Sequence, residues 1–409
     1  MHQTYQKTNE TNTVYATQHS YATKNSVVLC HRSQKKTSNT NNYRTVLSGI
    51  YAIAPRLRGG HRFITLFFAR RLAKIIGLVD KPNARKHHQG VVPLVGGISI
   101  CFTVTLTVLM FDIDIAHTGL FLFSICTLTV LGALDDKYDI SFKSRMLCQA
   151  LLSLAMMHFA NLELHTLGNM FGLGHTNLGG FATLVTVLGV IGAINAFNMV
   201  DGIDGLLGGL SIVSFSALAY LLYQEGHSGL GLLCLIFIVA ALPYIGMNLG
   251  LLGRQRKVFM GDAGSMMIGF TIIWLLLSSS QDNSGAIMRP VTALWLIALP
   301  LMDMVAIMIR RIRRGDSPFH PDREHLHHIC QRLGLSSRQT LFAICLLASM
   351  LTGFGLYGEI AQIPEPVMFY AFIACFVGYA ISLSYIWRIT RFVRAKLGQE
   401  VEPETVALK

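Results

Sequence analysis

Long apolar runs separated by short polar loops fill the chain from residue 63 almost to its end. A helix needs roughly 17–25 mostly apolar residues to cross a bilayer, and most of these runs reach that length. The first run is the weakest, because Arg70, Arg71 and Lys74 interrupt it. The pattern predicts an all-α, polytopic integral membrane protein with about eleven transmembrane helices, at 63–79, 94–111, 118–134, 145–160, 181–199, 206–223, 229–248, 263–280, 290–309, 340–357 and 366–387.

Lys and Arg are concentrated in alternate loops. One set, with the tail, reads "DKPNARKHHQG", "DDKYDISFKSR", "GRQRK", "RRIRRGDSPFHPDREHLHH" and "RITRFVRAK". The other set reads "FDIDIAH", "NLELHTLGNMFGLGHTN", "QEGHS", "QDNSGA" and "GEIAQIPE", without a Lys or Arg. Because loops rich in Lys and Arg stay in the cytoplasm, we expect the first set to face the cytoplasm, with the N-terminus outside and the C-terminus inside.

Composition supports the membrane class. Of 409 residues, 52% are hydrophobic and only 14% are charged, whereas soluble proteins carry roughly a quarter charged residues. The net charge of +12 would suit a nucleic-acid binder, but the basic residues lie between apolar runs, where they orient helices or meet anionic lipid and phosphate. Nucleic acid is therefore not an expected partner.

Three regions follow from these patterns. Residues 1–62 are polar and rich in Thr and Asn, which predicts a disordered or adventitious N-terminal extension. Residues 63–395 form the predicted transmembrane domain, and 396–409 a cytoplasmic tail.

A first acidic motif, "LGALDDKYD", ends the third predicted helix with Asp135, Asp136 and Asp139. On a helix, Asp135 and Asp139 would share one face. Adjacent carboxylates repel each other unless a cation or proton intervenes, so they suit a divalent metal or a proton-accepting role. A solvated loop is the alternative, and D-D-x-x-D is also a prenyl-diphosphate-binding pattern.

Two further motifs place polar groups at the same membrane edge. In "NAFNMVDGIDGLLGG", Asn198, Asp201 and Asp204 recur every third residue, which would align them along a final helical turn. In "KVFMGDAGSMMIGF", Asp262 precedes an apolar helix. Asp262 is either a helix N-cap or a metal-binding carboxylate.

The last cytoplasmic loop combines arginines with histidines. Arg side chains match phosphate oxygens well, although basic loops also follow from topology alone. The cluster contains Arg310, Arg311, Arg313, Arg314, Arg323, His320, His325, His327 and His328. Together with the acidic motifs it offers carboxylates for a hard metal and cations for phosphate, as phosphoryl transfer requires. A membrane location implies that one substrate is a lipid.

At these motifs the chain resembles the polyprenyl-phosphate N-acetylhexosamine-1-phosphate transferase family. "VDKPNARKHHQGVVPLVGG", "LGALDD", "NAFNMVDGIDGL", "VFMGDAGS" and "SPFHPDREHLHH" match in family order, and the likeness covers roughly 63–395. Within the family, "PDREHLHH" is similar to the branch that uses UDP-GlcNAc, while the muramoyl-pentapeptide branch carries three consecutive histidines.

The resemblance implies transfer of GlcNAc-1-phosphate from UDP-GlcNAc to undecaprenyl phosphate. The products would be UMP and GlcNAc-diphospho-undecaprenol, in the first membrane step of O-antigen or enterobacterial common antigen type glycan synthesis. It implies Mg²⁺, or Mn²⁺, as cofactor. The implied location is the bacterial inner membrane, with the active site facing the cytoplasm. The expected partners are both substrates and the lipid bilayer, with a homodimer left open.

The resemblance also implies roles for individual residues. Asp262, Asn198 and Asp136 would bind the metal, and Asp135 or Asp136, with Asp262, would serve catalysis. The implied substrate-binding residues are Asp201, Asp204, Arg323, His325, His327, His328, Lys81, Arg85, Lys86 and His88.

Three alternative functions share part of this pattern. The same reaction could use another UDP-N-acetylhexosamine. A transporter would place its acids near the bilayer midplane within inverted repeats, and no halves of this chain resemble each other. An intramembrane prenyltransferase would need a second aspartate-rich motif of the "DDKYD" kind.

Overall fold

A computed structural model describes residues 60–80, 91–281, 286–318 and 325–385. The predicted N-terminal extension lies outside these residues, except for its last three, which begin the first helix described. The predicted cytoplasmic tail also lies outside them. Everything below concerns the described part of the chain.

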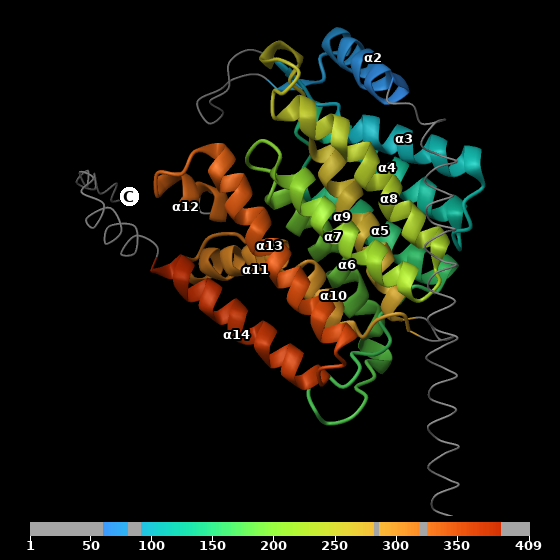
Figure 1. Ribbon diagram of the computed structural model, residues 1–409, viewed down its shortest axis with the longest axis vertical. Coiled ribbons are helices and arrows are strands. Elements are labelled where there is room, and N and C mark those ends of the chain that lie inside the picture. The colour runs from blue at the N-terminus through green and yellow to red at the C-terminus, as the bar shows by residue number, and fades with distance from the viewer. Residues whose placement is uncertain (1–59, 81–90, 282–285, 319–324, 386–409) are drawn as a thin grey trace, which may run out of the picture. The chain divides into compact units, whose positions relative to one another are not determined.

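Nearly all regular structure is helical (Figure 1). The helices are α2 (Gly60–Ile76), α3 (Gly96–Phe111), α4 (Thr118–Tyr138), α5 (Phe142–Ala160), α6 (Ala182–Met199), α7 (Leu206–Gln224), α8 (Ser228–Asn248), α9 (Asp262–Ser280), α10 (Pro290–Leu296), α11 (Ala298–Arg313), α12 (Leu326–Arg332), α13 (Ser337–Ile360) and α14 (Glu365–Ser384), with short 3-10 turns η1 (Gly179–Phe181) and η2 (Arg254–Arg256). Among the described residues, the only strands are β1 (Val79–Asp80) and β2 (Val92–Pro93), which pair antiparallel and are an addition to the predicted all-α class.

Each predicted apolar run coincides with a helix, or in one case with two. Among the described residues, seven helices are long and apolar enough to cross a membrane: α4, α6 with η1, α7, α8, α9, α13 and α14. An eighth span is reached if α10 and α11 count as one. The polytopic membrane architecture is thus confirmed, while the count of eleven spans stays a prediction. Helix α2 has 17 residues and is not among the candidate spans.

The run at 290–309 is not one straight helix, as predicted, but two helices that meet at an angle of 81°. The cause lies in Pro300, which cannot donate a backbone hydrogen bond to the carbonyl of Leu296, four residues earlier. Helix α10 ends at Leu296, and the hydroxyl of Ser214 on α7 donates to the freed Leu296 carbonyl at 2.9 Å. The break is therefore stabilised by a neighbouring helix.

Helix α9 is the most buried of the seven candidate spans, with 89% of its apolar window inside the protein. Glycines on α3 and α4 let these two helices pack directly against the backbone of its first turn. A Cβ atom added at Gly97 on α3 would meet the backbone of Gly264, and one at Gly132 on α4 would meet the backbone of Ala263. The start of α9, where Asp262 lies, is consequently packed on two sides.

The two sets of loops lie at opposite ends of the bundle. His117, Asn161, Gly226 and Gln281, from four loops of the set without Lys or Arg, line one pocket. Helix α4 runs from His117 toward Asp135, and α9 runs from Asp262 toward Gln281. The acidic motifs therefore gather at the end away from that pocket, about 30 Å along a helix of this length.

Candidate active site

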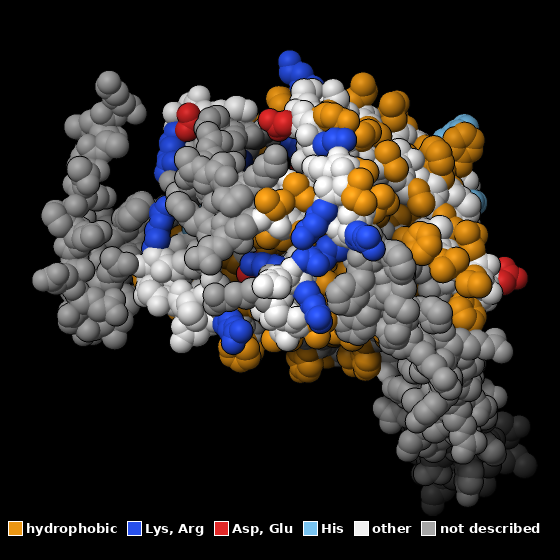
Figure 2. Space-filling view, turned by 90° about the horizontal axis from the view of Figure 1, so that it is seen from above, with side chains coloured by type: hydrophobic (Ala, Val, Ile, Leu, Met, Phe, Trp, Pro, Cys, Tyr) orange, Lys and Arg blue, Asp and Glu red, His pale blue; other side chains and the backbone are white. Residues whose placement is uncertain are grey.

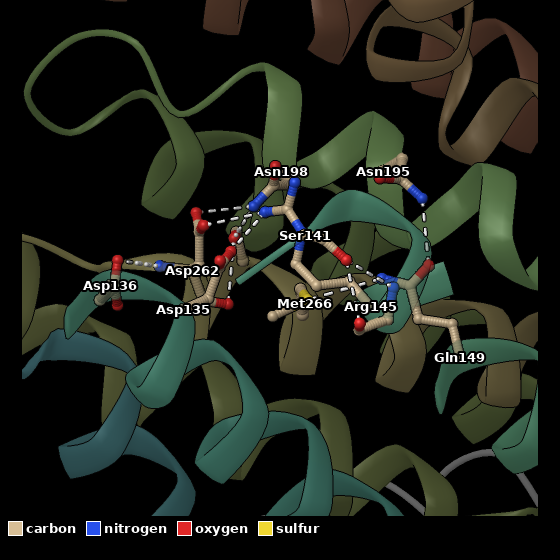
Figure 3. A network of polar contacts seen from close by, with 11 residues as sticks. Asp135, Asp136, Ser141, Arg145, Gln149, Asn195, Asn198, Asp262 and Met266 are labelled. Carbon is tan, nitrogen blue, oxygen red and sulfur yellow. Dashed lines mark hydrogen bonds and ion pairs between the residues drawn. The ribbon is translucent and has the colours of Figure 1, made fainter. Parts of the chain in front are cut away.

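A guanidinium joins two of the predicted acidic motifs. Nη1 of Arg145, on α5, contacts Oδ2 of Asp135 and lies 3.2 Å from Oδ2 of Asp262 (Figure 3). Asp135 is buried, whereas Asp262 and Arg145 are partly accessible to solvent. Because two carboxylates this close repel each other without a positive charge between them, Arg145 is the cation that keeps them together.

Asn198, at the end of α6, connects the third motif to the same carboxylate. Its Nδ2 donates to Oδ1 of Asp262 at 2.9 Å and to Oγ of Ser265 at 2.8 Å. Both bonds use Nδ2, so Oδ1 is the atom with which Asn198 could bind a cation. Three motifs far apart in the sequence thus converge on Asp262.

Asp136 supports α9 directly. Its Oδ1 accepts a hydrogen bond of 3.1 Å from the backbone N–H of Asp262, the first residue of that helix. Gly261 before it has φ +73°, and a Cβ atom there would also meet the Asp136 carboxylate. Asp262 is therefore not the N-cap of α9. The residue that satisfies its free N–H group is Asp136.

Two expectations about helix faces were wrong. Asp139 does not share a helical face with Asp135, because it ends α4 in the left-handed region, at φ +54°, and is exposed. Asp201 and Asp204 do not lie on the last turn of α6, which ends at Met199. The Asp-Gly pairs that follow form a loop instead, and only Asn198 of that triplet is helical.

The loop still keeps both acids near the site. Surrounding protein, followed by the negative charges of Asp262, Asp136 and Asp204, raises the pKa of Asp201 to about 7, although the residue remains accessible to solvent. Asp204 pairs with Lys257, whose Nζ lies 2.6 Å from its Oδ2. Asp201 is thus only partly ionised at neutral pH, while the negative charge of Asp204 is compensated by Lys257.

The histidines come from α12 and the residue before it. His327 is buried, and its ring lies where a Cβ atom at Gly202 would be, between Asp201 and Asp204 in sequence. Burial, and then His328 and His325, lower the pKa of His327 to about 3, so its ring is neutral at physiological pH. Its Nε2 has no hydrogen-bond partner among the described residues. His327 therefore packs against the acidic loop as a neutral group.

The predicted metal can be tested against these donors. Among the residues described, no three His, Cys, Asp or Glu side chains are grouped so as to hold a metal ion. The site offers two neighbouring carboxylates, Asp135 and Asp262, with the amide of Asn198 beside them. Mg²⁺ is commonly bound through one or two carboxylates and substrate phosphates. The donors fit Mg²⁺ bound with a phosphate-bearing substrate, not an all-protein cage.

Basic side chains lie on this end of the bundle. Figure 2 looks onto the face that carries α2 and η2 and shows Lys and Arg side chains gathered between apolar areas. Lys81, Arg85, Lys86, His88 and Arg323, all predicted to bind substrate, lie outside the described residues. Their predicted roles stay predictions.

Two residues at the site were not predicted from the sequence. Arg145 and Lys257 both lie in predicted cytoplasmic loops, where positive charge was attributed to membrane orientation or to contact with anionic lipid and phosphate. A usable signal was their position within a few residues of an acidic motif, since "DDKYDISFKSR" and "GRQRKVFMGD" each contain both charges.

Comparison with known proteins agrees with the geometry. Residues 118–280 match the family described as Glycosyl transferase family 4. The chain is similar to proteins named undecaprenyl-phosphate alpha-N-acetylglucosaminyl 1-phosphate transferase. That of Yersinia pestis is 53% identical over 330 residues, which cover 80% of this chain and 90% of the relative. That of Escherichia coli K12 is 51% identical over 330 residues, which again cover 80% of this chain and 90% of the relative. That of Pasteurella multocida is 50% identical over 334 residues, covering 81% of this chain and 93% of the relative.

Proposed function

Because the chain belongs to glycosyl transferase family 4, among its undecaprenyl-phosphate alpha-N-acetylglucosaminyl 1-phosphate transferases, we propose that it transfers GlcNAc-1-phosphate from UDP-GlcNAc to undecaprenyl phosphate. An oxygen of the lipid phosphate attacks the β-phosphorus of UDP-GlcNAc. The bond from that phosphorus to the bridging oxygen breaks, and UMP leaves with the oxygen. The products are UMP and GlcNAc-diphospho-undecaprenol.

The observation that carries this proposal is the contact of Arg145 with both Asp135 and Asp262. Positive charge and paired carboxylates at one end of a membrane bundle suit a reaction between two phosphate groups. Arg145 is placed to bind a phosphate oxygen when a substrate arrives. Asp135 or Asp136 is the candidate to accept the proton of an acceptor phosphate that still carries one.

Mg²⁺, with Mn²⁺ as a substitute, is the proposed cofactor. When bound, it would neutralise charge on the diphosphate. Asp262 and Asn198 are the ligands that the geometry favours, since they already contact each other at 2.9 Å. Asp136 was also a predicted ligand, but its Oδ1 accepts a hydrogen bond from α9, so it can reach a metal only through its other oxygen.

An apolar cavity suits the lipid acceptor. The cavity, of about 370 Å³, lies between α6, α9, α10 and α11, where the span is broken. Gly192 of α6 lines it and precedes Asn198 by six residues, or about 9 Å along the helix. The cavity extends from Gly192 to Leu164 and Ser280 at the opposite end of the bundle. A polyprenyl chain that lies in it and leaves at Gly192 would bring its phosphate toward Asp262.

The proposed location is the bacterial inner membrane, with this end of the bundle in the cytoplasm, where UDP-sugars are available. The basic loops support this orientation by the positive-inside rule.

The test is UMP release by the purified protein with UDP-GlcNAc, Mg²⁺ and undecaprenyl phosphate. We expect release only when all three are present, and more slowly with UDP-GalNAc. Asp262→Asn and Asp135→Asn should lower the rate at least about 100-fold with unchanged expression and thermal stability in Mg²⁺. UMP release without the lipid phosphate would overturn the proposal.

A further inference from the structure

Asp303 is a buried carboxylate in the apolar stretch "ALPLMDMVAIM" of α11, with 3% of its surface exposed. Burying a carboxylate costs several kcal/mol unless hydrogen bonds and charges compensate it. An acid retained at such a position therefore indicates a function for its partners. Asp303 takes no part in the proposed function as far as the contacts of Asp135, Asp262 and Asn198 define it.

Three donors from two other segments converge on this carboxylate. Nδ1 of His325 lies 2.8 Å from Oδ2. The hydroxyl of Tyr379, on α14, donates to Oδ1 at 2.5 Å, and the backbone N–H of Leu326 donates to Oδ1 at 3.3 Å. The two oxygens thus have separate tasks, because Oδ1 anchors the start of α12 and α14 while Oδ2 holds the ring of His325.

His325 belongs to the wall of the candidate active site. Its ring lies nearly parallel to that of His327, with the centroids 5.7 Å apart. His327 in turn packs against Gly202, in the loop that carries Asp201 and Asp204. A contact chain of three residues therefore connects Asp303 to the acidic loop.

The hydrogen bond decides which nitrogen of His325 is available. A carboxylate only accepts hydrogen bonds, so Nδ1 must carry a hydrogen, and Nε2 is left for other contacts. If the ring also carries a hydrogen on Nε2, it can donate to a phosphate oxygen while Asp303 compensates the positive charge.

We propose that Asp303 is a positioning residue that holds the His325 ring by Nδ1 and thereby presents Nε2 to the diphosphate of the donor. This inference rests on the proposed function for the identity of the diphosphate. It does not require His325 to transfer a proton, because the doubly protonated ring donates from Nε2 to the diphosphate and from Nδ1 to Asp303.

Asp303→Asn is the decisive variant, because it keeps the size of the side chain. Tyr379 and Leu326 both donate to Oδ1, so the asparagine must keep its carbonyl oxygen there and place its NH₂ group against His325. Nδ1 of His325 then has to accept, and the neutral ring carries its hydrogen on Nε2. Because Nδ1 cannot accept this bond and also carry a hydrogen, the ring can no longer be the positively charged donor that Asp303 supports. We expect kcat/KM for UMP release to fall about 10- to 100-fold.

A double-mutant cycle separates positioning from a purely structural role. If Asp303 acts through His325, Asp303→Asn should change kcat/KM by less than about 3-fold in a His325→Gln background. Tyr379→Phe is the matched control, since it removes one bond to the same carboxylate but leaves the contact with His325. Its activity should stay within about 3-fold of wild type. An equal loss from Asp303→Asn in both backgrounds would overturn the inference.

Nitrogen-15 NMR of histidine-labelled protein gives a readout without substrate. The His325 signals, assigned by their loss in His325→Gln, should show hydrogen on Nδ1 of the neutral ring in wild type and on Nε2 in Asp303→Asn. The same state in both proteins would refute positioning by Asp303. If wild type releases no UMP from UDP-GlcNAc, the proposed function fails and these spectra alone decide the role of Asp303.

Discussion

Lys257 lies with its Nζ 2.6 Å from Oδ2 of Asp204, so the loop after α6 is tied to the segment before α9. The two partners are separated by 53 residues in sequence. Both side chains are only partly buried, with 22% and 36% exposed, so the pair contributes little to stability. Its effect is to fix the position and the charge of Asp204.

Removing this lysine should affect donor binding. Lys257→Met leaves Asp204 as an uncompensated negative charge near the site of an anionic substrate. We expect KM for UDP-GlcNAc to rise about 10-fold with little change in kcat, as measured by UMP release. Asp204→Asn together with Lys257→Met should restore part of the loss. The neighbouring exposed Arg256→Met is the control, and an equal rise in KM there would contradict a specific role of the pair.

Arg145→Ala should separate charge compensation from catalysis. Without the guanidinium, Asp135 and Asp262 repel each other, so Tm in EDTA should fall. Because Mg²⁺ can replace the missing positive charge, the rise in Tm on adding Mg²⁺ should exceed that of wild type. UMP release should still fall about 100-fold, since a cation placed for phosphate is lost. Lys143→Ala, exposed two residues earlier on α5, should leave both quantities unchanged.

Asn198→Ala should lower the apparent affinity of the enzyme for Mg²⁺. The amide holds Oδ1 of Asp262 and offers its own oxygen, so its loss should raise the Mg²⁺ concentration for half-maximal activity about 10- to 100-fold. Asn195→Ala is the matched control on the same helix, because Asn195 donates to Oε1 of Gln149 at 3.1 Å, away from Asp262. Equal Mg²⁺ dependence of the two variants would remove Asn198 from the metal site.

The cavity behind α6 should respond to filling. Gly192 faces it with only Cε of Met304, at 3.8 Å, near the position of an added Cβ atom. Gly192→Leu should raise KM for undecaprenyl phosphate about 10-fold and leave KM for UDP-GlcNAc unchanged. Gly378→Leu on α14, where a Cβ atom meets nothing within 4 Å, is the control. A change in the donor KM alone would show that the cavity does not bind the acceptor.

His327 should make the protein sensitive to mild acid. Its folded pKa of about 3 lies below the unfolded value near 6.5, because burial disfavours the charged ring. As pH falls through 6.5, the unfolded chain binds a proton that the folded protein does not, so stability is lost downward from that pH. At pH 5.5 the loss amounts to about 1.4 kcal/mol.

Thermal unfolding at pH 7.5 and 5.5 measures this effect. His327→Gln should lose less Tm than wild type between the two pH values. His175→Gln, exposed at the other end of the bundle, should lose as much as wild type. If His327→Gln also loses as much as wild type, the ring is protonated in the folded protein.

The apolar runs predicted the helices because a span must hide its backbone polar groups within itself, whatever its neighbours are. Helix ends were harder to predict. Asp201 and Asp204 were assigned to a helical turn, although the glycines that follow them favour an end to the helix. Pro300 indicated a break in the helix, although the length of the apolar run suggested one continuous span. Asp303 was overlooked although a lone acid in an apolar run is a functional signal.

The contacts of Arg145 and Lys257 could not be derived in the same way. They depend on how α5, α9 and the loop after α6 pack, and no local pattern encodes a pairing across 117 or 53 residues. The sequence could therefore place the candidate residues at one membrane face, but not decide which acid meets which cation.

The first turn of α9 also bears on how natural variants of this protein will be interpreted. Gly97 and Gly132 touch its backbone where no side chain can be inserted, so even alanine at either position must displace Asp262. In a survey of tolerated substitutions, these two glycines will be as intolerant as the carboxylate itself, although neither has a side chain to offer a substrate. Intolerance to substitution alone would thus assign too many residues to the active site. A substitution at either glycine would inactivate the enzyme because it displaces Asp262, not because it removes a group that takes part in the chemistry.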